Sequence, residues 1–156
     1  METTKASEPQ VMVEPRDSLS DQKIDIKILN LPAGAEVTLR AKLTSDSGNV
    51  FESFARYVAS QNGIVSVMDD VCHGGTYTGV EPMGLLWSMK PAEGQRKGLR
   101  LNKRDVSKPY VIHLDVFKSI ECSDEAILAS VTFRRHFMGK GVRRIPVRAG
   151  RVRGTL

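Results

Sequence analysis

Apolar and polar residues alternate along most of this chain, which is the pattern of half-buried β-strands rather than of helices. The three isoleucines of residues 24–28 are separated by charged residues, and residues 37–43 follow the same rule. Strands are predicted on this basis at residues 24–28, 37–43, 50–59, 64–67, 110–116 and 127–133, with a last one at 141–147. Helical periodicity is nearly absent.

Turn residues separate these strands. Leu31–Gly34 and Asp46–Asn49 combine proline, glycine and asparagine, which preset tight reversals. Asn62-Gly63 suits the positive φ angles of a two-residue hairpin, so strands 50–59 and 64–67 are predicted to pair with each other. Short strands joined by turns, without helical crossovers, predict an all-β fold, an immunoglobulin-like antiparallel β-sandwich of about seven strands.

The middle of the chain, residues 68–108, breaks this rhythm because it is rich in glycine and contains two prolines. A structureless insertion of that length is unusual in a compact domain. We therefore predict a short strand at Leu85–Met89 that fixes the segment to the core through Trp87.

The chain has 156 residues, enough for a single core, with 40% hydrophobic and 26% charged residues. Residues 1–10 are predicted to be a disordered leader and residues 11–149 the β-sandwich domain. No apolar run is long enough for a bilayer, so no membrane partner is expected. Two cysteines are too few for a disulfide scaffold, which favours a reducing compartment.

The basic residues gather near the C-terminus. Residues 126–156 hold no acidic residue and carry Arg134, Arg135, Lys140, Arg143, Arg144, Arg148, Arg151 and Arg153. Such a tail can bind a polyanion, because each cation can pair with a phosphate. Few aromatic residues accompany the arginines, so nucleic acid is not the expected partner.

Motifs of catalysis and metal binding are largely missing. The sequence has no Gly-x-Ser-x-Gly or Gly-x-Cys-x-Gly elbow, and Gly139-Lys140-Gly141 lacks the rest of a phosphate loop. Asp69, Asp70, Cys72 and His73 are metal-ligand types without a second pair at zinc-like spacing, so a turn is predicted and no metal. His113 and Asp115 share one strand face, and a solvated face is favoured there over a nucleophilic relay.

Several segments together resemble one family, the type I acyl-CoA thioesterases and the related bile acid-CoA:amino acid N-acyltransferase. The resemblance is to their N-terminal domain. It rests on Leu31–Gly34 with Val37–Ala41, on Gly79-Val80-Glu81-Pro82-Met83-Gly84-Leu85-Leu86-Trp87-Ser88, on Lys103-Arg104-Asp105-Val106, on Gly141–Arg144 with Val147-Arg148, and on Gly150-Arg151-Val152-Arg153-Gly154-Thr155-Leu156.

The resemblance implies a β-sandwich that precedes an α/β-hydrolase domain of the same chain. That domain would carry the nucleophile, Asp and His, and residues 150–156 are expected to be its start. No catalytic residue is therefore assigned, and this part alone is expected to be inactive. The whole enzyme would hydrolyse acyl-CoA to free fatty acid and CoA, or pass the acyl group to an amino acid, with acyl-CoA as substrate and no cofactor.

Two groups of site residues follow from this family reading. Glu81, Met83 and Trp87 are expected at an interdomain face or the edge of the substrate site, and Lys103, Arg104, Arg151 and Arg153 near the CoA phosphates. The expected location is the cytoplasm by default, with mitochondria and peroxisomes open. The alternative is a stand-alone interaction module that holds a polyanion with its basic tail.

Overall fold

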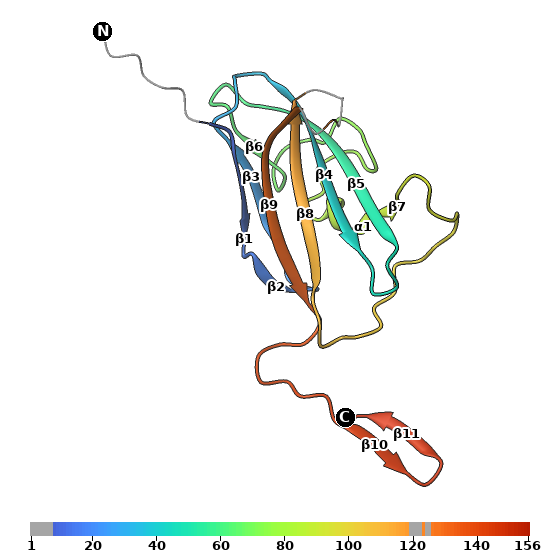
Figure 1. Cartoon of the computed structure of the whole chain (residues 1–156). Coiled ribbons are helices and arrows are strands. Elements are labelled where there is room, and N and C mark those ends of the chain that lie inside the picture. The colour runs from blue at the N-terminus through green and yellow to red at the C-terminus, as the bar shows by residue number, and fades with distance from the viewer. Residues whose placement is uncertain (1–7, 119–122, 124–125) are drawn as a thin grey trace.

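Two facing β-sheets form the body of the molecule, as the computed structural model shows for residues 8–118, 123 and 126–156 (Figure 1). The small sheet has the order β1 (Gln10–Glu14), β3 (Asp25–Leu29), β6 (Val65–Ser66). The large sheet has the order β2 (Asp17–Leu19), β9 (Ile127–His136), β8 (Tyr110–Lys118), β4 (Glu36–Thr44), β5 (Val50–Val58), β7 (Lys90–Pro91). The predicted all-β sandwich is confirmed.

The alternating residues form the core between the sheets. The inward rows of both sheets are buried, including Ile24, Ile26 and Ile28 near β3, Leu39 and Leu43 of β4, and Ile112 and Leu114 of β8. The strands predicted from this alternation around residues 24–28, 37–43, 50–59, 110–116 and 127–133 are confirmed.

One strand pairing departs from the antiparallel prediction. β1 and β2 are consecutive but belong to different sheets, and β2 runs parallel to β9, with Asp17 opposite Arg134. Pro15 stands between them and has no N–H group, so it cannot continue the ladder of β1. The chain therefore crosses from the small sheet to the edge of the large one at this point.

The predicted hairpin at Asn62-Gly63 is wrong. β6 lies at the predicted position but pairs with β3 of the small sheet, so the turn carries the chain from one sheet to the other. Gly63 has a φ of 72°, and a Cβ at this residue would lie 2.0 Å from the carbonyl oxygen of Leu31. This glycine allows a close approach of two backbones, rather than a two-residue reversal.

The predicted strand at Leu85–Met89 is also wrong, because Gly84–Trp87 forms the short helix α1. The run Leu85-Leu86-Trp87 does not alternate, and only Leu85 is fully buried, whereas Trp87 is 62% exposed. Ser53 in β5 fixes the segment by donating a hydrogen bond of 2.5 Å from its Oγ to the Leu85 carbonyl. The edge strand β7 follows α1 directly and pairs with Phe51 and Glu52.

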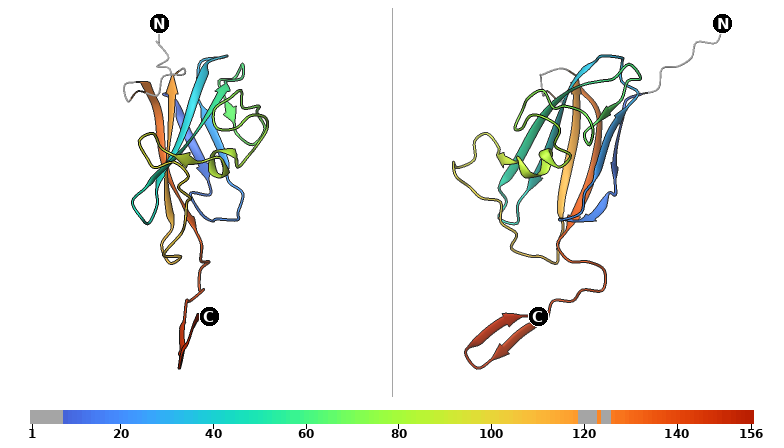
Figure 2. Two further views of the ribbon diagram at one scale, coloured as in Figure 1. Left: turned by 90° about the vertical axis from the view of Figure 1, so that its right-hand side faces the viewer. Right: turned by 180° about the vertical axis from the view of Figure 1, so that it is seen from behind.

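The C-terminal residues form a separate hairpin of β10 (Pro146–Ala149) and β11 (Val152–Thr155), which lies apart from the sandwich (Figures 1 and 2). The strand predicted at 141–147 therefore begins only at Pro146. The predicted boundary between residues 149 and 150 falls in the turn of this hairpin. Residues 1–7 of the predicted leader lie outside the described part, and Gln10 begins β1.

A buried tyrosine pair fixes the loop that leads to α1. The hydroxyl groups of Tyr57 and Tyr77 are 2.5 Å apart. Burial raises the pKa of both, that of Tyr57 to about 12, so both groups are protonated at neutral pH. The ring of Tyr77 packs directly on the Cα of Gly84.

The Gly84→Ala substitution should therefore destabilise the protein. The added Cβ would lie 2.5 Å from the Tyr77 ring, and overpacking of this kind costs about 1–3 kcal/mol. Urea unfolding followed by circular dichroism measures the difference. Gly139→Ala is the matched control, because its Cβ would meet only Val142 at 3.8 Å. Equal stability of both variants would contradict the packing argument.

Candidate functional site

An apolar groove of about 450 Å³ opens at one end of the large sheet. Its walls come from the turn after β2, from the segment around α1, and from the ends of β4, β8 and β9. The apolar lining residues are Leu43, Met83, Leu86, Trp87, Met89, Leu101 and Ile112. Two thioethers and an exposed indole make a surface that adapts to flexible apolar ligands.

Two buried polar side chains also line this groove. Arg135 is only 3% exposed. It occupies an inward position of β9, in the same row as the apolar residues Phe133 and Val131 two and four residues earlier. Its Nη atoms donate hydrogen bonds of 2.7 Å to Ser18 Oγ, Ser20 O and Gln22 O. Burial lowers the pKa of Arg135, but a guanidinium stays protonated under any ordinary condition.

The charge of Arg135 has no partner of opposite sign at close range. In the described residues, no carboxylate forms an ion pair with this guanidinium, and the three bonded oxygens are neutral. Asp21 is exposed on the rim of the groove and acts on Arg135 only from a distance. A buried cation without an anion is costly for a protein to hold.

Tyr110 lies beside Arg135, directly opposite it in the register of β8 and β9. The side chain is 8% exposed, and burial raises the pKa of its hydroxyl. Within the described ranges, this buried hydroxyl oxygen has no hydrogen-bond partner. The groove thus combines apolar walls with a cation that has no ion-pair partner and a hydroxyl group that has no hydrogen-bond partner among the described residues.

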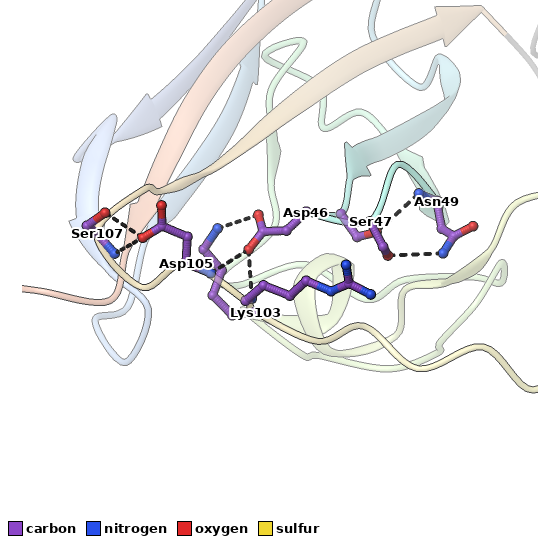
Figure 3. Close-up of polar contacts among 8 residues, drawn as sticks. Asp46, Ser47, Asn49, Lys103, Asp105 and Ser107 are labelled. Carbon is purple, nitrogen blue, oxygen red and sulfur yellow. Dashed lines mark hydrogen bonds and ion pairs between the residues drawn. The ribbon is translucent and has the colours of Figure 1, made fainter. Parts of the chain in front are cut away.

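The side chain of Lys103 does not point freely into solvent. It belongs to a set of contacts between Asp46 and residues 103–105, which we call the loop lock. Its Nζ lies 2.6 Å from Asp46 Oδ1, and the backbone N–H groups of Arg104 and Asp105 donate to Asp46 Oδ2 at 2.7 and 2.9 Å (Figure 3). Asp105 in turn accepts two hydrogen bonds from Ser107. The segment 103–107 is thereby tied to the β4–β5 turn.

The remaining basic candidates are exposed. Arg104 joins the lock through its backbone only, and its side chain forms no ion pair within the described residues. Arg153 donates from Nη1 to the carbonyl oxygens of Gly150 and Val152, so it fixes the turn of the hairpin. Arg151 is exposed in that turn. The structure does not bring Arg151 and Arg153 together with Lys103, because these two arginines lie on the separate hairpin (Figure 1).

The other polar clusters have local roles. His113 Nδ1 lies 3.0 Å from Thr132 Oγ1, and Asp115 bonds to Arg40 and Ser130, so the two residues do not form a relay with each other. Asp70 accepts the backbone N–H of Ser66, as a turn residue does. Among the described residues no cluster of His, Cys, Asp and Glu could hold a metal ion.

A comparison with known proteins identifies the family of this sandwich. Residues 21–149 match the model of the acyl-CoA thioester hydrolase/BAAT N-terminal region. The chain belongs to that family. It is 43% identical to acyl-coenzyme A thioesterase 3 of Mus musculus over 95% of this chain and 34% of that protein. It is 45% identical to the mitochondrial acyl-coenzyme A thioesterase 2 of Rattus norvegicus, over 87% and 29% of the two chains.

A third relative is the peroxisomal succinyl-coenzyme A thioesterase of Mus musculus, 42% identical over 92% of this chain and 34% of that protein. The chain spans about a third of the length of these relatives. In the part of the chain that the structure describes, no helix is long and apolar enough to cross a membrane.

The structure separates the three residues that were predicted at an interdomain face or at the edge of the substrate site. Met83 and Trp87 line the same groove, whereas Glu81 is exposed and does not line it. The sequence analysis missed Arg135 and Tyr110 as site residues. The available signal was an arginine at an inward position of a strand, where the alternation of β9 calls for an apolar side chain.

The Asp46→Asn substitution should weaken the contacts of this residue with residues 103–105. It should also reduce the loss of folding stability at acidic pH. The hydrogen bond from Lys103 lowers the pKa of Asp46 from 3.8 to about 2. A lowered folded-state pKa means that Asp46 stabilises the fold above pH 3.8 and loses this effect as the pH falls toward 2. The variant should be less stable at pH 7 and lose less stability between pH 4 and pH 2, as measured by urea midpoints.

Glu93→Gln is the control, because Glu93 is exposed and forms no ion pair in the part of the chain that the structure describes. Asp17 and Asp105 also have lowered pKa values, so part of the loss of stability at acidic pH should persist in the Asp46 variant. If the Asp46 variant lost as much stability between pH 4 and pH 2 as the wild type, the loop lock would not contribute to the pH dependence of stability.

Proposed function

We propose that this chain is the non-catalytic N-terminal domain of an acyl-CoA thioesterase, or of a related acyl-CoA:amino acid N-acyltransferase. The observation that carries the proposal is the family match over residues 21–149, together with relatives about three times as long. In such an enzyme an α/β-hydrolase domain of the same chain would supply the nucleophile, the base and the oxyanion donors. Acyl-CoA would be the substrate, without a further cofactor.

The role proposed for the sandwich is to cover one side of the acyl site. Trp87 is the most exposed aromatic ring on the described surface, and Met83 and Leu86 continue the apolar patch around it. An apolar patch beside a groove favours an interface with another domain. We propose that α1 and Met83 face the hydrolase domain, and that Glu81 lies at the border of that interface.

The chimera in which this chain replaces the N-terminal third of the rat mitochondrial thioesterase 2 tests this role. The chimera should release CoA from palmitoyl-CoA, whereas this chain alone should not. Met83→Asp should lower kcat/KM of the chimera at least about tenfold, because an unpaired carboxylate would enter an apolar interface. Val111→Asp on the outer face of β8, where Val111 is 38% exposed, is the control. Equal activity of the two variants would remove the basis for this interface.

The C-terminal hairpin supports a second part of the proposal, which concerns the CoA phosphates. Arg148 and Arg153 are cross-strand neighbours on one face, and Arg151 stands in the turn. Like charges directly opposite each other are unfavourable unless an anion lies between them. We propose that Arg151 and Arg153, with Arg104 as a more distant contributor, attract the phosphate groups of CoA. Because Lys103 is paired with Asp46, its contribution would be to position Arg104.

Arg151→Gln in the same chimera should raise KM for palmitoyl-CoA severalfold at low salt and leave kcat unchanged. The difference should disappear near 1 M salt, where the screening length is about 3 Å. Arg100→Gln is the control, since Arg100 is exposed in the loop before Lys103 and carries the same charge. A KM difference that does not depend on salt would argue against phosphate attraction. If a polyanion such as heparin binds this chain tightly while the chimera is inactive, the interaction-module alternative gains support instead.

The cytoplasm is the default location in this proposal. Relatives named mitochondrial and peroxisomal are among the matched proteins, so organelle location of the whole enzyme is the competing outcome of a localisation experiment.

A further inference from the structure

The groove beside α1 has features that a packing surface alone does not need. Its walls are apolar, yet it contains the buried residue Arg135 and the buried hydroxyl group of Tyr110. Among the described residues, no carboxylate forms an ion pair with Arg135, and the Tyr110 hydroxyl has no hydrogen-bond partner. A ligand that suits the groove therefore needs an apolar body and an anionic head that accepts hydrogen bonds.

We infer that this groove binds a fatty acid through its free carboxylate. The carboxylate would accept hydrogen bonds from the Arg135 guanidinium and from the Tyr110 hydroxyl, which are cross-strand neighbours. The alkyl tail lies along Met83, Leu86 and Trp87, where the transfer of its methylene groups from water to an apolar surface favours binding.

Charge complementarity selects this head group over a neutral one. The charged residues that line the groove are Arg135, Lys23 and Asp21, so the lining carries one net positive charge. Asp21 is exposed on the rim and weakens the attraction for an anion, whereas Arg135 is buried at the groove wall. A carboxylate at Arg135 would supply the opposite charge that this guanidinium lacks.

The inference deepens the proposed function and rests on it in one respect, because a thioesterase releases this kind of acid as its product. The groove residues all belong to this chain, however, so binding does not require the hydrolase domain. A binding experiment without turnover therefore separates failure of this inference from failure of the proposed enzyme.

Trp87 is the only tryptophan of the chain and lines the groove, so its fluorescence reports occupancy directly. Laurate, titrated below its micelle concentration into the 156-residue chain, should shift the Trp87 emission to shorter wavelength. Dodecanol has the same tail without the carboxylate and should bind at least about tenfold more weakly. Lauroyl-CoA, whose acyl end is a thioester, distinguishes the free acid from the conjugate and should also be weaker at this site.

Tyr110→Phe is the most informative variant, because it removes one hydroxyl group that has no partner in the described structure and should leave the fold intact. It should weaken laurate binding about tenfold in isothermal titration calorimetry and leave dodecanol binding unchanged. Arg135→Gln should weaken laurate binding about a hundredfold, and Arg134→Gln on the exposed side of β9 is its control. Asp21→Asn should strengthen binding.

Arg135 also holds the turn after β2, so its variant needs a circular dichroism spectrum that matches the wild type. If it fails to fold, the Tyr110 variant and the comparison of laurate with dodecanol decide. Equal affinity for laurate and dodecanol would overturn the inference, and so would laurate binding that leaves the Trp87 emission unchanged or that Tyr110→Phe does not affect.

Discussion

The sandwich is built from two sheets of unequal length, and this mismatch determines where a site can form. β4, β5 and β8 have nine residues each, whereas β1 and β3 have five. At about 3.4 Å per residue, the large sheet extends about 30 Å and the small one about 17 Å. The inner face of the large sheet therefore needs other cover at one end. The turn after β2 and the segment around α1 provide it, and the groove is the space between these covers.

The same end of the large sheet holds two cations that are nearly buried, and their partners differ. The Lys103 side chain is 7% exposed, stacks over the Tyr110 ring at 4.8 Å and is neutralised by Asp46. Arg135 is bonded only to neutral oxygens of the β2 segment. Both cations lie among apolar side chains, but only Lys103 has its charge balanced by a carboxylate within the described structure. This difference separates a loop lock from a ligand site, because a balanced ion pair needs nothing further.

The sequence predicted those parts of the fold that follow from period-two alternation. Long strands such as β4 and β8 bury one side chain in two, so their apolar rows are visible without a structure. The prediction from the sequence was wrong where tertiary contacts decide the structure. Asn62-Gly63 is compatible with a hairpin, but Gly63 lies against the backbone of Leu31, and the chain passes there to the other sheet. Met83 and Trp87 were found through a family motif, whereas Arg135 and Tyr110 were missed because neither belongs to one. Only their register and burial reveal that they share a groove.

The groove and the C-terminal hairpin are linked through the end of β9. Arg135 is followed by His136, which is fixed to Asp17 at 2.9 Å, and then by Phe137, whose ring meets Tyr110 edge-on at 5.4 Å. Tyr110 thus contacts both the groove and the first residue of the segment that leads to β10. This edge contact between the two rings attaches the start of the segment to the groove wall. The wall of the groove and the first residue of the segment that leads to the basic hairpin therefore meet at one side chain, Tyr110.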